Sequence, residues 1–315
     1  MTRLRGAMEN GGLEAASTGL REGLSSVGRD GLSLDWGAGM TTYESKTADE
    51  VGEYFDDRSW LFGLSGFNLH IGYFDDEKPD TDPKERHTEV MIEAAELGAG
   101  SRLLDVGCGF GRPAVAAAKT TGAQVLGINV SAEQVRQGQK LAEEAGVSEL
   151  VSFEQADGMA LPYPDGSFDA VWASEAIMYM SDRPKALREI ERVLVPGGRF
   201  VLSDYAERED LSDEQRTALK EGFTVEALPT IEGYRGLLLD AGLEITRFED
   251  ATAHLHRSAA RIPEVLDEKY AYIAERGGKE FADEFKEMLS KVGVLEGEVL
   301  GYVIAVGRKA AEPRA

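Results

Sequence analysis

Cysteine is almost absent from this sequence. The chain of 315 residues holds a single one, Cys108, so it cannot form an internal disulfide. This composition agrees with a reducing compartment such as the cytosol. Cys108 stands between Gly107 and Gly109, and a reactive cysteine needs a basic setting that these neighbours do not supply. We therefore interpret Cys108 as a small residue required by a tight loop rather than as a nucleophile.

Basic residues are also scarce. Lys and Arg number 34 against 57 Asp and Glu, which gives a formal net charge of -23. A surface this acidic repels nucleic-acid phosphates and anionic lipids, and no basic stripe overrides that effect. No run is long and apolar enough to span a bilayer, and the N-terminus lacks the apolar core of a secretory signal. We expect a cytoplasmic protein whose partner is a small or neutral molecule, not a nucleic acid or a membrane; a homo-oligomer stays open.

Large apolar residues are few in the first 39 positions, which are rich in glycine, serine and charge. This composition predicts a flexible tail over 1–39. An N-terminal helical cap is predicted for 40–98, because the spacing of apolar residues indicates helices over 47–64 and 83–97.

Strands and helices then alternate, which is typical of a parallel doubly wound sheet. The core over 99–206 is predicted to hold strands over 102–106, 124–130, 151–155, 168–174 and 199–204, and helices over 113–120, 132–145 and 183–193. A lid region that completes the sheet is predicted over 207–315, with a lid segment over 207–230, a helix over 231–241, a strand over 243–250, a helix-rich insertion over 258–292 and a final edge strand over 298–308. The predicted fold class is α/β, with seven mostly parallel strands, an N-terminal helical cap and a C-terminal lid insertion.

The most informative string is Asp105-Val106-Gly107-Cys108-Gly109-Phe110-Gly111, which follows a predicted strand and opens a helix. Glycines at this place let the backbone approach a ligand at the carboxyl end of the sheet. Alone, the string is compatible with a dinucleotide site or a simple tight turn. Two features argue against a dinucleotide: the spacing lacks the longer final gap, and the second strand ends in Asn129 instead of an acid.

Four further strings follow in order along the chain: Ala156-Asp157-Gly158-Met159, Pro164-Asp165-Gly166-Ser167-Phe168-Asp169, Leu187-Arg188-Glu189 and Val195-Pro196-Gly197-Gly198-Arg199. Together with the glycine loop they resemble the class I S-adenosylmethionine-dependent methyltransferases. The similarity covers roughly residues 50–250. It points to the small-molecule branch that contains sugar O-methyltransferases, tocopherol and sarcosine methyltransferases, and prenyl C-methyltransferases. The resemblance implies a Rossmann-like fold and S-adenosyl-L-methionine as cofactor.

The resemblance also implies roles for individual residues around the cofactor. Gly107, Gly109 and Gly111 would pack against its methionine part, and Asp105 would fix the loop or meet the amino group. At the ribose, a polar residue replaces the usual acid in this branch, and the matching positions are Asn129, Ser131 and Gln134. Asp157 would accept a hydrogen bond from the adenine amino group, with Gly158 and Met159 beside the ring. Ser174 is a further expected cofactor contact.

The string Asn68-Leu69-His70-Ile71-Gly72-Tyr73 resembles a segment that folds over the cofactor in this branch. His70 and Tyr54 would then point toward the sulfonium or the carboxylate of the cofactor. His70 is equally compatible with a buried histidine whose hydrogen bonds are satisfied by the protein.

The acceptor pocket is expected after the fourth strand, at residues 174–180. Similar sugar O-methyltransferases carry a histidine pair where this chain has Met178 and Tyr179, and the string resembles the E-x-x-M-Y segment of prenyl diphosphate C-methyltransferases. In a carbon methylation, the aromatic face of Tyr179 would stabilise a carbocation and Glu175 would remove a proton. Alternatively, Glu175 only organises the cofactor loop.

Other polar candidates for the acceptor side are His70 as a base, Asp204, His254 and His256. No magnesium motif is convincing, and the acid pairs Asp56-Asp57 and Asp75-Asp76 are interpreted as solvated faces. We therefore predict no metal.

The sequence predicts an enzyme that methylates a small molecule, such as a secondary metabolite, with a preference for a prenyl, terpenoid or aromatic carbon. Methylation of oxygen or nitrogen in a natural product is the alternative. A catalytically inactive S-adenosylmethionine-binding protein and a nicotinamide oxidoreductase are more remote.

Overall fold

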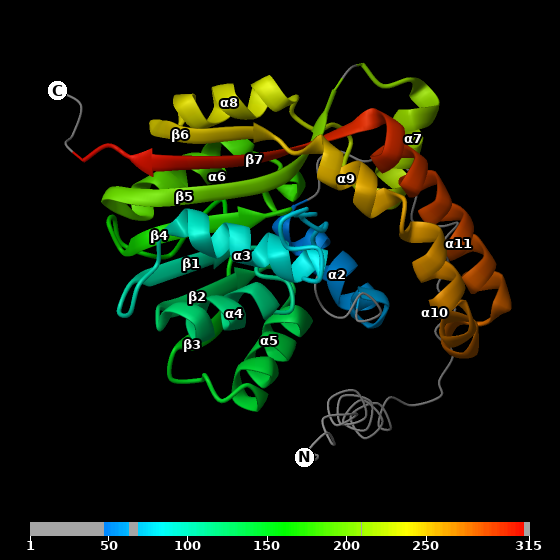
Figure 1. Ribbon diagram of the computed structural model, residues 1–315, viewed down its shortest axis with the longest axis horizontal. Coiled ribbons are helices and arrows are strands. Elements are labelled where there is room, and N and C mark those ends of the chain that lie inside the picture. Colours follow the sequence, from blue (N-terminus) through cyan, green and yellow to red (C-terminus); the bar gives the residue numbers. More distant parts are fainter. Residues whose placement is uncertain (1–46, 63–68, 209, 312–315) are drawn as a thin grey trace, which may run out of the picture. The chain divides into compact units, whose positions relative to one another are not determined.

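A single sheet of seven strands organises the chain. The computed structural model describes residues 47–62, 69–208 and 210–311, so the tail predicted over 1–39 lies outside the described residues. The strand order is β3-β2-β1-β4-β5-β7-β6 (Figure 1). The strands are β1 (Arg102–Val106), β2 (Gln124–Asn129), β3 (Val151–Gln155), β4 (Phe168–Ser174), β5 (Leu194–Glu207), β6 (Leu243–Asp250) and β7 (Leu300–Lys309). The strands β1 to β5 pair in parallel and β7 is antiparallel to both neighbours, which confirms the predicted fold class.

Helices cover both faces of this sheet. One face packs against α3 (Pro83–Ala95), α4 (Arg112–Thr121) and α5 (Ala132–Glu144), and the other against α6 (Arg183–Val193) and α8 (Ile231–Asp240). Because both faces are covered, the inner strands are nearly continuous apolar runs: Leu103, Leu104 and Val106 of β1 are all fully buried.

The helices begin where the sequence supplies caps. Ser131 accepts a hydrogen bond from the Gln134 N–H at the start of α5, as its position predicted. Asp82 and Asp182 cap α3 and α6 in the same way, and each is followed by a proline in the first turn. Local residue choice therefore fixes where these helices start.

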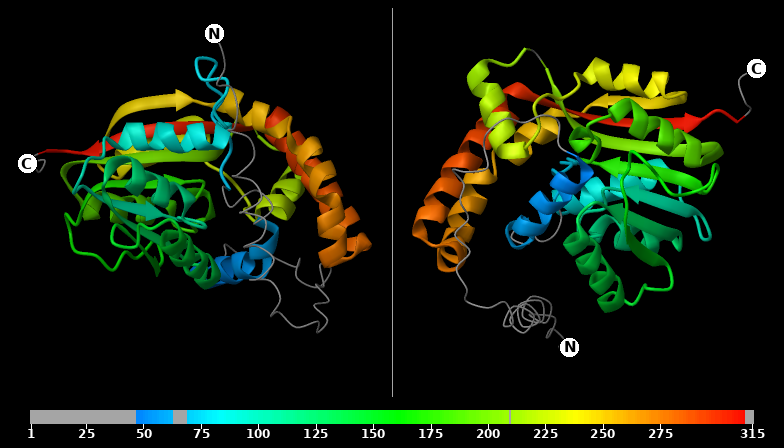
Figure 2. Two further views of the ribbon diagram at one scale, coloured as in Figure 1. Left: turned by 60° about the horizontal axis from the view of Figure 1, so that its bottom comes forward. Right: turned by 180° about the vertical axis from the view of Figure 1, so that it is seen from behind.

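The remaining helices lie beyond the carboxyl ends of the parallel strands (Figures 1 and 2). They are α2 (Ala48–Phe62), α7 (Asp213–Phe223), α9 (Thr252–Ala259), α10 (Ile262–Gly277) and α11 (Lys279–Val294). An apolar cluster that includes Tyr205, Leu219, Leu255 and Leu300 joins α7 and α9 to the ends of β5 and β7. Ligands of open α/β sheets bind at this end, so the candidate site is expected here. Among the described residues, no helix is long and apolar enough to cross a membrane.

Two strand predictions are wrong in instructive ways. The strand predicted over 298–308 is not an edge: β7 inserts between β5 and β6, and β6 forms the edge. The strand predicted over 199–204 is longer, because β5 already begins at Leu194, directly after α6, and continues to Glu207. The Pro196-Gly197-Gly198 string therefore lies inside the strand, where the pairing of β4 and β5 shifts register.

Candidate active site

The three glycines of the loop between β1 and α4 all have positive φ, at 76° for Gly107, 53° for Gly109 and 80° for Gly111. Packing requires two of them. A Cβ on Gly107 would lie 2.4 Å from the Cβ of Ala176, and one on Gly111 would lie 2.3 Å from an aromatic ring of β3. A Cβ on Gly109 would meet only the Leu69 side chain, at 3.6 Å. Gly109 is therefore the glycine of this loop that faces open space, where a ligand can approach the backbone.

Two buried polar atoms near this loop have no hydrogen-bond partner among the described residues: Oδ2 of Asp105 and Nε2 of Gln134. Asp105 is almost completely buried, and burial raises the pKa of its carboxyl to about 7. Unpaired buried polar groups are rare in native proteins. Both atoms fit the cofactor expected from the sequence. Asp105 Oδ2 can accept a hydrogen bond from an ammonium group, and Gln134 Nε2 can donate one to a hydroxyl group.

Asn129 and Ser131 are engaged by the protein itself. The Asn129 side chain donates to Gln134 Oε1 at 2.8 Å and accepts from the Ser131 N–H at 2.9 Å. Ser131 Oγ donates to Oδ1 of Asp56 in α2, which also accepts from the Glu133 N–H at 3.1 Å. The prediction that Asp56 belongs to a solvated face is therefore wrong, because this carboxylate docks α2 onto the start of α5.

The turn after β3 is closed by the predicted adenine-side residues. Asp157 Oδ1 accepts from the Met159 N–H at 2.8 Å. Gly158 is buried, and a Cβ there would lie 2.6 Å from Met180 Cε. The sulfur of Met159 accepts from the Ser181 hydroxyl at 3.5 Å. One oxygen of Asp157 thus holds the turn, and its role toward the cofactor stays a prediction.

The segment 71–74 is fixed by four consecutive backbone N–H groups, each bonded to a different residue. The acceptors, in order, are Glu175 Oε1 (2.8 Å), Ser258 Oγ (3.0 Å), Pro83 O (2.7 Å) and His254 Nδ1 (3.0 Å). Ser258 and His254 are four residues apart on one face of α9, a spacing that could have identified them as a pair. His254 also stacks on Tyr73, with 3.9 Å between ring centroids. It serves here as a structural acceptor.

His70 is a satisfied buried histidine. Its Nδ1 donates to the Ile71 carbonyl at 2.8 Å, and its Nε2 lies 3.2 Å from the Thr88 hydroxyl. The ring stacks on that of His87 at 4.4 Å, and burial lowers the pKa of His70 to about 4. The prediction of His70 as a base is corrected, because neither ring nitrogen is free to take a proton from an acceptor.

Glu175 follows β4 and connects three distant segments. Its Oε1 accepts from the Ile71 N–H at 2.8 Å and from the Tyr302 hydroxyl of β7 at 2.8 Å, and its own N–H donates to the Ser203 carbonyl. Its φ is 51°, a left-handed conformation that is uncommon outside glycine and recurs at functional sites. Burial raises the pKa of the Glu175 carboxyl to about 8. Its Oε2 makes no hydrogen bond to the described residues.

The aromatic residues on the acceptor side contact α2. Tyr179 is partly buried and its ring meets that of Phe55 edge-on, with 5.3 Å between centroids. Tyr54 contacts the other side of Phe55 and lies under the guanidinium of Arg58. Met178 is 1% exposed, so it belongs to the core and not to a pocket wall. The M-Y string is therefore explained in part by packing.

Two further candidates are held by the protein. Both oxygens of Asp204 accept backbone N–H groups, from Met178 and from Tyr205, at 2.9 Å each. Ser174, a predicted cofactor contact, lies 2.9 Å from the hydroxyl of its cross-strand neighbour Ser203. Ser203 in turn contacts Nε2 of His87 at 3.0 Å. No local pattern indicates this His87–Ser203 contact, because the two residues lie 116 positions apart.

Comparisons with known proteins agree with this geometry. The family model described as "Methyltransferase domain" matches residues 104–202. Methyltransferase GfsG of Streptomyces halstedii is 37% identical over 236 residues, covering 72% of this chain and 84% of that protein. The chain belongs to the class I S-adenosylmethionine-dependent methyltransferases. The predicted family, enzyme class and cofactor are thereby confirmed.

Two more similarities describe this methyltransferase further. The 27-O-demethylrifamycin SV methyltransferase of Amycolatopsis mediterranei is 36% identical over 270 residues, covering 84% of this chain and 98% of that protein. The crystal structure of the [4+2]-cyclase SpnF superposes with a TM-score of 0.72 and 31% identity, covering 86% of this chain and all of the other. The name of the Amycolatopsis mediterranei relative gives a small molecule as its acceptor, and this chain is a small-molecule methyltransferase.

Within the described part of the methyltransferase, no group of three or more His, Cys, Asp or Glu side chains is arranged to hold a metal ion. Asp75 and Asp76 pair instead with Arg86 and Arg257, at 2.9 Å and 3.2 Å. Cys108 is buried, and burial raises the pKa of its thiol well above the ordinary value, so the thiol is unreactive.

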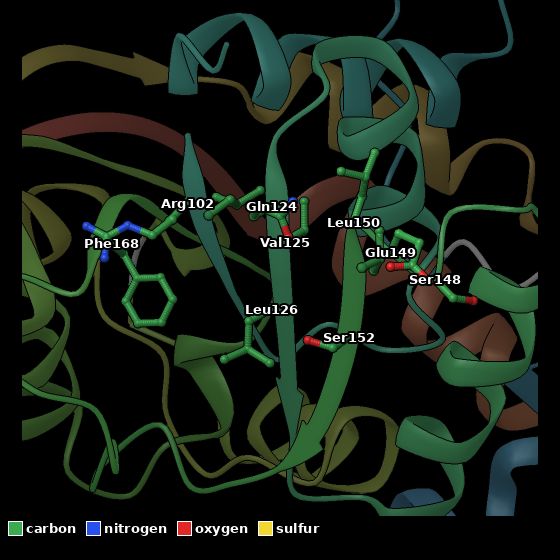
Figure 3. A pocket seen from close by; sticks show the side chains of 11 residues that line it. Arg102, Gln124, Val125, Leu126, Ser148, Glu149, Leu150, Ser152 and Phe168 are labelled. Carbon is green, nitrogen blue, oxygen red and sulfur yellow. The ribbon is translucent and has the colours of Figure 1, made fainter. Parts of the chain in front are cut away.

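A hollow of about 280 Å³ lies at the opposite end of the sheet (Figure 3). Its walls include Arg102, Gln124 and Val151, the first residues of β1, β2 and β3, together with Phe168 at the start of β4. Because ligands of open α/β sheets bind at the carboxyl ends of the strands, this hollow is not part of the candidate site.

The stability of the methyltransferase should fall as the pH rises. Burial raises the pKa of Glu175 to about 8, and those of Asp105, Asp204 and Glu296 to about 7. Unfolded carboxyls titrate near ~4. Between this pH and the raised pKa values, the folded chain binds more protons than the unfolded chain, so its stability falls as the pH rises to ~7 to ~8. Buried histidines with a lowered pKa make stability rise with pH, but only below about pH 6.5, the pKa of an unfolded histidine.

We expect a lower urea midpoint at about pH 8.5 than at about pH 6.5, and a smaller difference in Glu296→Gln than in the exposed control Glu298→Gln. A midpoint that does not change over this interval would contradict the assigned shifts.

Proposed function

We propose that this methyltransferase transfers the methyl group to a hydroxyl oxygen of an uncharged natural product, and that Glu175 takes the hydroxyl proton. The observation that carries the proposal is the asymmetry of the Glu175 carboxyl: Oε1 is held by two donors, while Oε2 remains open. In this orientation Oε1 holds the carboxylate in place, and Oε2 is left to take the proton from the acceptor hydroxyl.

Three other candidates, His70, Asp204 and His254, are engaged by the protein, which supports Glu175, whereas Nε2 of His256 is buried without a hydrogen-bond partner among the described residues. His70 has both ring nitrogens in contact with the protein, and the two oxygens of Asp204 receive backbone N–H groups. His254 accepts through Nδ1 from a backbone N–H. The pKa of about 8 for Glu175 lies near a working pH, where a general base combines availability with basicity.

The cofactor supplies an activated methyl group on a sulfonium, so the protein must bind, orient and exclude water. On this proposal the methionine part of the cofactor lies against the open face of Gly109, and Asp105 Oδ2 accepts a hydrogen bond from its ammonium group. Gln134 Nε2 donates to the ribose, and Asp157 accepts a hydrogen bond from the adenine amino group, as the resemblance to the family implies. Ser131 and Asn129 support this arrangement by fixing Gln134 and α2.

An oxygen acceptor replaces the carbon acceptor preferred from the sequence. A prenyl diphosphate needs several cations, whereas the charges that act on Glu175 include the carboxyls of Asp204 and Glu296 as well as the Lys84 ammonium. The nearby Arg183 guanidinium donates to the carbonyls of Met178 and Ala227. Several relatives are named as O-methyltransferases, and the name of the Amycolatopsis mediterranei relative indicates an oxygen acceptor in a large natural product.

The proposal is tested with S-adenosylmethionine carrying a deuterated methyl group. The purified chain is offered 27-O-demethylrifamycin SV, geranyl diphosphate and sarcosine in separate reactions, the compounds that the relatives and structural neighbours name. Transfer to a hydroxyl of the first compound, located by mass spectrometry and NMR, is the expected result. Transfer to geranyl diphosphate or sarcosine instead would overturn the oxygen assignment.

The similarity to SpnF supports a second candidate, cyclisation without methyl transfer. That outcome has its own signature, because an intramolecular cyclisation gives a product with the mass of the substrate and no deuterium. Such a product, with S-adenosylmethionine unconsumed, would favour the cyclase function over methylation.

A further inference from the structure

A buried acid outside the described machinery lies in the turn between α11 and β7. Glu296 is part of the π-helical turn η3 (Leu295–Val299) and is 7% exposed. Its sequence neighbours in the turn, Leu295 and Val299, belong to the apolar cluster beyond the ends of β5 and β7. π-helical turns are rare and often occur at functional sites. A carboxyl in an apolar cluster is costly unless it is paired, so its retention calls for a reason.

Glu296 is anchored in the same way as Glu175. Tyr205 of β5 and Tyr302 of β7 are directly opposed in the register of the two strands, with 5.4 Å between their ring centroids. The Tyr302 hydroxyl donates to Glu175 Oε1 at 2.8 Å, and the Tyr205 hydroxyl donates to Glu296 Oε1 at 2.9 Å. Cross-strand partners project from the same face of a sheet, so the two tyrosines carry their two carboxyls on one face.

Glu296 also resembles Glu175 in the oxygen that it leaves open. Its Oε2 makes no hydrogen bond to the described residues. Burial raises the pKa of Glu296 to about 7, while the nearby Lys84 ammonium lowers it. Two carboxyl oxygens without protein donors, on side chains held by opposed tyrosines and in electrostatic interaction with each other, attract hydrogen-bond donors such as hydroxyl groups.

We propose that Glu296 determines acceptor specificity: its Oε2 accepts a hydrogen bond from a second hydroxyl of the acceptor, close to the hydroxyl that Glu175 deprotonates. The ligand class is therefore a molecule with two neighbouring hydroxyls. This inference rests on the proposed function for the identity of the methylated atom, but the recognition of a hydroxyl pair can be measured without turnover.

The experiment compares catechol and resorcinol, which carry two hydroxyls, with phenol, which carries one. Binding to the full chain saturated with S-adenosylhomocysteine is measured by ligand-observed NMR, at a pH above the pKa of Glu296. A hydrogen bond to a charged group corresponds to at least a ~10-fold gain in affinity, so one of the two diols should bind ~10-fold more tightly than phenol. Glu296→Gln should reduce the preference to within ~2-fold.

The matched control is Glu298→Gln, a substitution in the same turn at an exposed residue, which should keep the full preference. Glu296→Leu, of similar size but without a polar group, tests the same point if glutamine still accepts a hydrogen bond. Equal binding of diols and phenol in the wild type, or a preference retained in both Glu296 variants, would overturn the inference. If the diol preference is present while no hydroxyl is methylated, the proposed function fails and the inference stands.

Discussion

Glu175→Gln is expected to methylate the acceptor at least ~100-fold more slowly than the wild type, because loss of a positioned base typically has an effect of this size. Its affinity for S-adenosylhomocysteine should be unchanged. Glutamine keeps the size of the side chain, and its carbonyl oxygen can still accept from the Ile71 N–H and the Tyr302 hydroxyl. Stopped-time assays with the deuterated methyl donor measure the rate, and calorimetry measures the affinity.

The pH dependence provides a second readout of the same prediction. Because the carboxyl must be ionised to take a proton, the wild-type rate should rise as the pH passes through the Glu175 pKa of about 8. The residual activity of Glu175→Gln should not show this rise. A purely structural role for Glu175 would leave the pH profile unchanged.

Ser258→Ala is the matched comparison, because it removes a different bond of the 71–74 segment, the one to the Gly72 N–H. It should retain most of the activity. If Ser258→Ala loses as much activity as Glu175→Gln, or if Glu175→Gln loses cofactor affinity in proportion to rate, then Glu175 acts by holding the segment and the base assignment fails.

Gly109→Leu is expected to lower the affinity for S-adenosylmethionine by ~100-fold or more. The new side chain would fill the open space beside the Leu69 side chain, where we propose that the methionine part of the cofactor lies. The φ of 53° adds a cost of roughly 1–2 kcal/mol for any residue other than glycine. Calorimetric titration with S-adenosylhomocysteine measures the effect.

The conformational cost can be separated from the steric effect with Gly146→Leu. Gly146 has a φ of 69° and open space around it, in the loop after α5 and away from the site. This control should lower the unfolding midpoint by a similar amount and leave the cofactor affinity unchanged. An undiminished affinity in Gly109→Leu would place the methionine part of the cofactor elsewhere.

Much of the site was predictable, because its cofactor half is built from short local strings. The glycine loop, the Asp157 turn and the Ser131 cap each follow a strand within a few residues, so the sequence places them at one edge of the sheet. The spacing did not reveal that Gly107 and Gly111 are required by packing while Gly109 faces open space. That distinction depends on which side chains of other elements lie opposite each glycine.

The acceptor half was predicted less well, because its residues act across long separations. Glu175 Oε1 joins Ile71 and Tyr302, which are 104 and 127 positions away along the chain. His70 and Asp56 are examples of residue types whose role depends on their surroundings in the fold. Burial against His87 removes His70 as a base, whereas contact with Ser131 gives Asp56 a docking role that an acidic chain composition conceals.

The sequence by itself determined the α/β class, the family and the cofactor. Periodicity, capping residues and glycine spacing are local properties, which can be recognised without knowing the tertiary contacts. Tertiary structure decided that β7 lies between β5 and β6, since the apolar residues of a strand show that it is buried but not which strands flank it. That insertion brings Tyr302 opposite Tyr205, so the two tyrosines that hold Glu175 and Glu296 lie on one face of the sheet. The arrangement requires β5 to pair with β7, about 100 residues further along the chain, which no local pattern specifies.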